Sequence, residues 1–210
     1  MQTRTYGDLF KLIQSLAGVG TFAASEKDDI ANFINRRFFE AFDETPMWPR
    51  YLVTGEERTI ATSPAQTIPY IEASKDNIGK FIRIHRTQPF LRNSALEFDF
   101  YVDSNGAHIL NLTTADASSA FVTYKKEFTP FTVTSDYENS TVEVPAEFYN
   151  FVAHTAYADF LRMDGQTDKA LIEEQTGAKY LALELEKVDI KMNNTTVNKR
   201  FSTHGNRQSR

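Results

Sequence analysis

The spacing of the apolar residues changes twice along this chain, and that change limits the folds it can adopt. Before residue 50 the apolar side chains recur every three or four residues, which predicts helices. From about Tyr51 to Val144 apolar and polar residues alternate, which predicts antiparallel strands with two unlike faces. Helical spacing then returns as far as about Lys191. We therefore expect an α+β protein, a helical bundle of N- and C-terminal helices with a central antiparallel β-rich insertion.

Local signals predict where the first two helices begin and end. Thr5 and Asp8 have the spacing of a capping box, and Gly18 is a typical helix terminator. A second helix is expected to begin with Ser25 as its cap. It should stop before Pro46, because the residue ahead of a proline is disfavoured in the helical conformation.

The C-terminal part predicts a helical hairpin. One helix starts around Pro145 and ends at Gly165, and a longer one runs from about Thr167 to Lys191. The short loop between them requires an antiparallel arrangement. The longer helix carries a coiled-coil-like seam of apolar residues, with further apolar surface beside it. The seam consists of Leu171, Ala178, Leu181, Leu185, Val188 and Met192.

Four segments follow from these patterns. The tail is polar and basic and offers too little apolar surface to offset the entropy of ordering, so we expect it to be flexible in the free protein. Within the insertion, Asp103-Ser-Asn-Gly106 predicts a hairpin turn. The segments are the N-terminal helices of the bundle (1–50), the β insertion (51–144), the C-terminal helical hairpin (145–191) and the extended basic tail (192–210).

The charge is unevenly distributed. The net charge is −5, and residues 192–210 contain four basic and no acidic side chains, so the rest of the chain carries about −9. An acidic body does not fit a nucleic-acid reader, whose binding face is normally basic. The chain has no cysteine, which excludes disulfides, Cys-ligated metals and thiol catalysis. No signal peptide or membrane-spanning stretch is predicted, and we expect a protein made in the cytoplasm.

No pattern of catalytic or metal-binding residues emerges. The four histidines are widely separated, and phosphate-loop and nucleophile-elbow motifs do not occur. Solvated helix faces explain the acidic pair Glu173 and Glu174. Arg83 and Arg86 are better explained by cross-strand ion pairs with an acidic strand at Glu97 than by base stacking. We expect no enzyme, no cofactor and no metal.

Apolar surface is left over once one core is filled. The chain has 17 phenylalanines and nine tyrosines, and the long helix has apolar residues outside its seam. Trp48 is expected in the core. Surplus apolar faces on a chain with a soluble composition are typical of subunit contacts.

Five short motifs carry a resemblance to a known family. They are residues 6–13 (YGDLFKLI), 28–35 (DDIANFIN), 48–50 (WPR), 144–148 (VPAEF) and 156–161 (AYADFL). With these motifs the sequence resembles the head-to-tail adaptor (connector, or gatekeeper) proteins of tailed bacteriophages. The similarity covers nearly the whole chain and is strongest at residues 1–50 and 144–191.

This resemblance implies a structural protein of the virion neck that is assembled in the host cytoplasm. About twelve copies would form a ring between the portal and a tail or nozzle protein, and genomic DNA would pass through it without sequence-specific binding. Alternatives are another neck component, such as a stopper or tail-completion protein, and a DNA-binding accessory protein. The family's C-terminal tail commonly contacts the portal, which here implies Lys199, Arg200, Phe201, Arg207 and Arg210.

Overall fold

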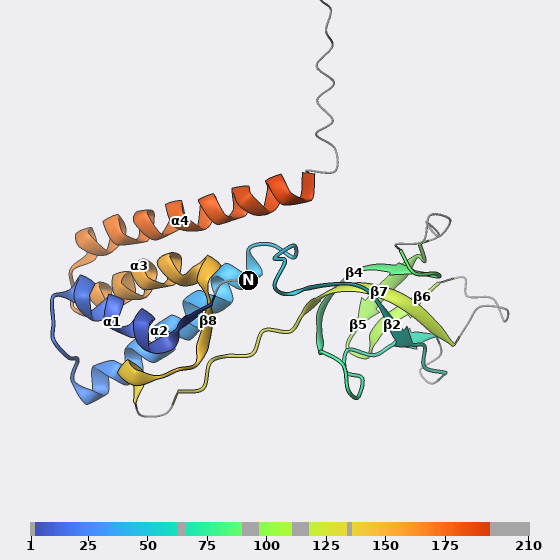
Figure 1. The fold of residues 1–210 in the computed structure, drawn as a ribbon, viewed down its shortest axis with the longest axis horizontal. Helices are drawn as coiled ribbons and strands as arrows, with labels where there is room; N and C mark the ends of the chain where they lie inside the picture. The colour runs from blue at the N-terminus through green and yellow to red at the C-terminus, as the bar shows by residue number, and fades with distance from the viewer. Residues whose placement is uncertain (1–2, 63–65, 90–96, 111–117, 134–135, 194–210) are drawn as a thin grey trace, which may run out of the picture.

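Two parts lie end to end in this protein, a helical body and a β unit (Figure 1). The computed structural model describes residues 3–62, 66–89, 97–110, 118–133 and 136–193. Within these ranges the helical body contains four α-helices and a two-stranded sheet, and the β unit contains six strands. The predicted α+β class, with a helical bundle and an antiparallel β insertion, is confirmed. Residues 192–193 of the expected tail belong to the last helix, and residues 194–210 lie outside the described residues.

The two N-terminal helices are fixed by caps at their first turns. Helix α1 (Tyr6–Ala17) starts as predicted, because the Thr5 hydroxyl accepts the main-chain N–H of Asp8 at 3.1 Å. Helix α2 (Ala24–Asp43) is capped differently. The main-chain N–H of Ala23 donates to the Glu26 carboxylate at 2.8 Å, so the expected cap at Ser25 is wrong. This contact is one half of a capping box, in which the carboxylate of the third helical residue accepts the N–H of the cap residue, while Ala23 has no side-chain oxygen to accept an N–H of the first turn.

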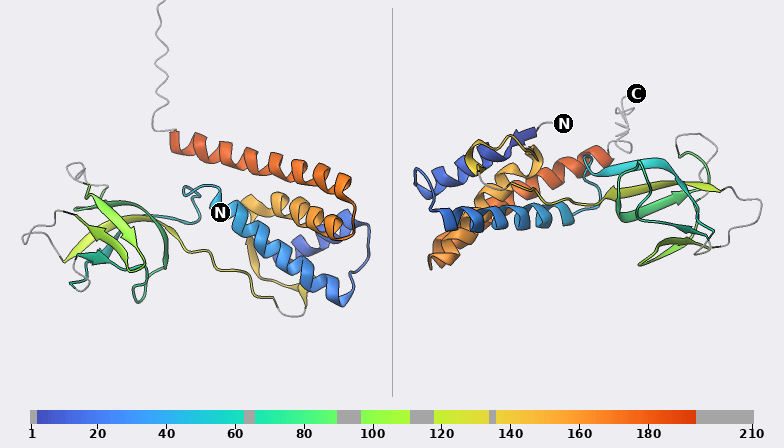
Figure 2. Two further views of the ribbon diagram at one scale, coloured as in Figure 1. Left: turned by 180° about the vertical axis from the view of Figure 1, so that it is seen from behind. Right: turned by 90° about the horizontal axis from the view of Figure 1, so that it is seen from below.

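The C-terminal helices form the predicted antiparallel hairpin. Helix α3 (Ala146–Met163) ends at a turn in which Gly165 has a φ of 79°, and helix α4 (Thr167–Asn193) runs back along it. Pro145 precedes α3 in an extended conformation and is not part of its first turn. Both views in Figure 2 show α4 lying along α3, with the N-terminal helices beside them.

A small sheet closes the helical body. Strand β1 (Thr3–Thr5) pairs with β8 (Glu143–Pro145) in an antiparallel register that sets Thr3 opposite Pro145. The last strand within the range 51–144 therefore packs with the helices, and the strands of the β unit end at Lys126.

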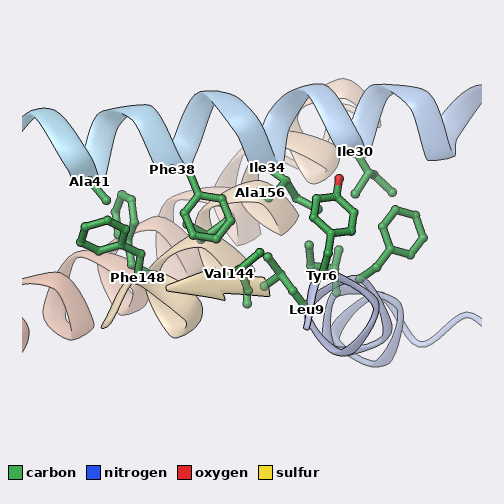
Figure 3. Close-up of a cluster of buried hydrophobic side chains, with 14 of the residues drawn as sticks. Tyr6, Leu9, Ile30, Ile34, Phe38, Ala41, Val144, Phe148 and Ala156 are labelled. Carbon is green, nitrogen blue, oxygen red and sulfur yellow. The ribbon is translucent and has the colours of Figure 1, made fainter. Parts of the chain in front are cut away.

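The core of the body joins the two ends of the sequence. Trp48 is buried, as expected, and its indole N–H donates to the Ala41 carbonyl at 2.9 Å. Figure 3 shows aromatic and aliphatic side chains from both halves meeting between the helices. They include Tyr6, Leu9, Ile30, Ile34, Phe38, Ala41, Val144, Phe148 and Ala156.

The β unit consists of two three-stranded antiparallel sheets around a second, smaller core. In one sheet β7 (Ser119–Lys126) lies between β2 (Leu52–Thr59) and β4 (Ile78–His85). In the other, β6 (Gly106–Ile109) lies between β3 (Thr67–Ile68) and β5 (Phe100–Asp103). The shared core includes Ile68, Ala107 and Ile109 from one sheet and Ile84, Val122 and Tyr124 from the other.

The predicted hairpin at residues 103–106 joins β5 to β6. The Asp103 carboxylate accepts the main-chain N–H of Asn105 at 2.7 Å, and Asp103 pairs with Gly106. Gly106 has a φ of 139°, and a Cβ there would lie 2.1 Å from the carbonyl oxygen of Ile68. This glycine is required both by its backbone conformation and by the close approach of β3.

The chain returning from the β unit is fixed to α2. The side-chain amide of Asn35 donates to the Phe131 carbonyl at 3.0 Å and accepts the Phe131 main-chain N–H at 2.8 Å. A short 3₁₀ helix, η1 (Tyr137–Asn139), follows, and the Tyr137 hydroxyl donates to Asp28 at 2.7 Å. This return segment completes the helical body.

Candidate assembly surface

The five residues expected to contact a portal protein lie outside the described residues. They are Lys199, Arg200, Phe201, Arg207 and Arg210. The described chain ends with α4, which therefore leads directly into the basic tail. The geometry of α4 is the part of this candidate site that the structure shows.

One face of α4 packs closely against α3. Ala170, Gly177, Leu181 and Val188 are buried on this face. A Cβ at Gly177 would lie 2.7 Å from the Thr155 methyl group and 3.2 Å from a main-chain oxygen of α3. The small residues in the first half of α4 thus allow the two helices to approach each other.

The predicted seam is correct only in its second half. Leu181, Leu185 and Val188 pack against the body as expected. Leu171 and Ala178 are exposed, and their expected place is taken by the neighbouring residues Ala170 and Gly177. The prediction is wrong in the first half of α4 because the close contact with α3 requires small side chains there. The spacing of apolar residues alone does not indicate this requirement. Met192 lies among residues whose side chains are not described.

The opposite face of α4, here called the outer α4 surface, exposes apolar side chains. Ile172 is 63% exposed, Leu183 is 54% exposed and Leu171 is 47% exposed. Ala178 and Ala182 lie between them on the same side of the helix. Large aliphatic residues along one exposed helix face are typical of surfaces that bind another protein.

A buried ion-pair network holds this surface in place. Arg37 of α2 donates two hydrogen bonds to Asp159 of α3, at 2.7 and 2.6 Å, and both side chains are buried. Arg36 pairs with the same carboxylate at 2.5 Å. Arg37 also lies 3.4 Å from Glu174 of α4, which is hydrogen-bonded to Arg162 as well. The network thus connects three helices.

The environment of Asp159 stabilises its ionised form. Burial alone would raise the pKa of this carboxyl, but hydrogen bonds and positive charge from Arg37 and Arg36 outweigh burial and hold the pKa below its usual value. An arginine among the apolar residues on one face of a helix is a sequence signal for such a pair. Arg37 lies on the buried face with Ile34 and Phe38.

The interpretation of Glu173 and Glu174 as a solvated pair is wrong. Glu173 lies 2.7 Å from Nδ1 of His154, whose ring also stacks on Tyr180 at 5.4 Å between centroids. Glu174 belongs to the network described above. Each carboxylate therefore contacts a different side chain of α3, His154 or Arg162, which fixes the rotation of α4 about its axis.

A second polar cluster in the β unit has the order of a catalytic relay. The Thr67 hydroxyl lies 2.9 Å from Nδ1 of His108, and Nε2 of His108 lies 2.9 Å from Asp103. A hydroxyl, an imidazole and a carboxylate in this order could activate a nucleophile. However, Thr67 is only 1% exposed, so a substrate has no access to its hydroxyl. The cluster links β3 to the β5–β6 hairpin and has a structural role.

Other predicted contacts are also structural. Arg83 lies 3.6 Å from Glu97, which confirms the expected cross-strand ion pair, and the guanidinium of Arg86 lies over the Phe98 ring. Across the described ranges, no group of three or more histidine, aspartate or glutamate side chains is arranged to hold a metal ion. No helix in the described part of the chain is long and apolar enough to cross a membrane.

Comparisons with known proteins give no assignment. No protein-family model matches the sequence, and no curated protein matches it. A functional hypothesis for this chain therefore depends on its own residues and geometry.

Proposed function

We propose that this protein is a head-to-tail adaptor of a tailed bacteriophage, a non-enzymatic structural protein that forms a ring beneath the portal. The observation that carries the proposal is the outer α4 surface, an exposed apolar helix face whose C-terminal end leads into a basic segment. One chain thus offers two different binding elements, one for neighbouring copies and one for a partner. A closed ring needs two complementary surfaces on each subunit for its two neighbours, and the outer α4 surface would be one of them.

The outer α4 surface is suited to contacts between copies. Ile172 and Leu183 together expose a large aliphatic area that packing against a neighbouring subunit would remove from water. Glu174 connects α4 to Arg37 of α2 and to Arg162 of α3, so little backbone freedom of α4 would be lost when the surface is covered.

The charge distribution supports the proposed contact with the portal and the proposed passage of DNA. Lys199, Arg200, Phe201, Arg207 and Arg210 give the tail four positive charges and one aromatic anchor for an acidic portal surface. The rest of the chain is acidic, and like charge would keep DNA from adhering to the wall of a channel.

The experiment is native mass spectrometry of the protein mixed with a candidate portal ring. Three chains are compared: the full-length protein, a version ending at Asn193, and the full-length double variant Ile172→Ser/Leu183→Ser. Gln175→Ser, on the same helix face, is the matched control.

We expect the full-length chain and the control to load onto the ring in multiple stoichiometric copies. The truncated chain should not bind, and the double variant should load incompletely because neighbouring copies no longer support each other. Absence of binding by the full-length chain would contradict the proposal. Equal loading by the truncated chain would instead place the portal contact on the helical body.

A further inference from the structure

Lys125 connects the two parts of the molecule at their junction. It lies near the end of β7, the central strand of its sheet, and its side chain is only 3% exposed. The Nζ atom donates a hydrogen bond to the main-chain carbonyl of Phe42 and lies 3.6 Å from the centroid of the Phe42 ring. Phe42 belongs to the last turn of α2, so a lysine of the β unit contacts the C-terminal end of a helix in the body.

This end of α2 attracts a cation. Helix α2 has no basic residue in its last turn, and Asp43 and Glu44 follow Phe42 directly. The last carbonyls of a helix lack partners within the helix and form its negative end. Lys125 supplies from another part of the chain the positive charge that the helix itself lacks.

The site nevertheless satisfies the ammonium incompletely. A lysine ammonium has three N–H donors, and within the described residues Lys125 contacts one carbonyl and one ring face and forms no ion pair. A buried charge without a carboxylate partner is costly compared with the same charge in water. The structure therefore shows a closed junction that holds a poorly solvated cation.

The neighbouring charges do not offset this cost. Burial is the largest effect on Lys125 and lowers the pKa, Asp43 of α2 acts in the opposite direction, and Lys80 of β4 lowers the pKa further. The paired residue on β2 is the uncharged Leu52. The net effect of burial and of these two charges is to lower the pKa of Lys125 from 10.5 to about 8.

We propose that the junction between the helical body and the β unit is a hinge controlled by the protonation of Lys125. The neutral amine favours the closed junction seen in the structure. The ammonium favours an open junction in which Lys125 is hydrated and the β unit can change its orientation relative to the body.

The sign follows from the two protonation equilibria. The closed form binds the proton less tightly than an open form with an exposed lysine. The free-energy cost of burying the ammonium in the closed form is therefore fully present below pH 8. It is relieved as the pH rises from about 8 towards 10.5. Raising the pH from 6.5 to 9.5 should therefore shift the closed-to-open ratio about thirtyfold towards the closed form.

Distance measurements between spin labels test this hinge on the full-length protein. The chain has no cysteine, so Ser104→Cys in the β unit and Gln175→Cys on α4 give two unique labelling sites, both exposed. Distance distributions are recorded at pH 6.5 and 9.5 for the labelled parent and with Lys125→Met added. Lys179→Met, an exposed lysine on α4, is the matched control.

The labelled parent and the control should give a broad distribution at pH 6.5 that narrows at pH 9.5. Lys125→Met, which fills the site without a charge, should give the narrow distribution at both pH values. An equal pH dependence with and without Lys125, or a broader distribution for Lys125→Met, would overturn the proposal. A thermal melt of each variant shows whether it is folded. The test involves the free chain alone and does not depend on binding to a portal.

Discussion

The helical body and the β unit are assembled from different kinds of contact. The body joins residues from opposite ends of the sequence, as the pairing of Thr3 with Pro145 shows. In the β unit every strand pairs with another strand between residues 52 and 126. The sheets of the β unit therefore use strands from one continuous stretch of the chain, whereas the body requires both ends of the chain.

The two parts also differ in the hydrogen bonds that they provide to a buried arginine. Arg37 in the body makes two hydrogen bonds to one carboxylate, Asp159. Arg58 in the β unit is fully buried, and its Nη2 atom contacts the Tyr124 hydroxyl and the Asp76 carbonyl, each at 2.6 Å, and the Glu56 carboxylate at 2.7 Å. Its Nε and Nη1 atoms have no hydrogen-bond partner among the described residues. Because incomplete satisfaction of a buried polar group is costly, we expect the β unit to be the less stable part.

The largest effect should come from breaking the network of the body. Asp159→Asn removes the buried carboxylate that Arg36 and Arg37 share and should lower the free energy of unfolding by about 3–5 kcal/mol. Urea denaturation followed by the fluorescence of Trp48 measures this, because the only tryptophan lies in the core of the body. Glu40→Gln, at the exposed partner of Arg37, is the control and should cost less than about 1 kcal/mol. Equal effects of the two variants would refute the role of the network.

A substitution in the β5–β6 hairpin should affect the β unit alone. Gly106→Ala combines a strained φ with a close contact to the Ile68 carbonyl and should cost about 2–3 kcal/mol. Hydrogen exchange should show lost protection in β3, β5 and β6, while the amides of α2 and α3 stay protected. Gly20→Ala, where a Cβ would meet nothing within 4 Å, is the control. Equal loss of protection in the helices would mean that the two parts unfold as one unit.

Acid should weaken the body through Asp159. The folded-state pKa of this carboxyl lies below its usual value, so its contribution is fully present above the usual value and is lost as the pH falls through the lowered pKa. The difference in unfolding free energy between the parent protein and Asp159→Asn should therefore shrink at acidic pH. Denaturation curves between pH 7 and pH 3 measure it, and a difference that stays constant over this range would contradict the assignment.

The smallest effect is expected at the surface ion pair of the β unit. Arg83 and Glu97 are both more than half exposed and lie 3.6 Å apart, so Arg83→Ala should cost no more than about 0.5 kcal/mol. Added salt should reduce even this cost, because it screens exposed charges. Urea denaturation at low and high salt checks both statements. A cost above about 1 kcal/mol would show that the β unit depends on this pair.

Local signals in the sequence were sufficient for the elements but not for their contacts. The Thr5 cap, the turn at Gly165 and the hairpin at Asp103 each depend on a few neighbouring residues and were predicted correctly. The burial of Ala170 in place of Leu171 and the pairing of Glu174 across helices depend on the position of α3, which no local pattern encodes. The candidate site was likewise predicted only in part. Surplus apolar surface on the long helix was expected, whereas the residues that form it are known only from the structure.

The position of the β unit between α2 and α3 has a consequence during synthesis. Helix α2 ends at Asp43 and α3 begins at Ala146, so about a hundred residues are translated before the first two helices meet their partners. At roughly 5–20 residues per second, this interval lasts about 5–20 s on the ribosome. The β unit is complete within the interval, while the apolar faces of α1 and α2 remain exposed to chaperones. The part of the protein that is translated first is therefore the part that finishes folding last.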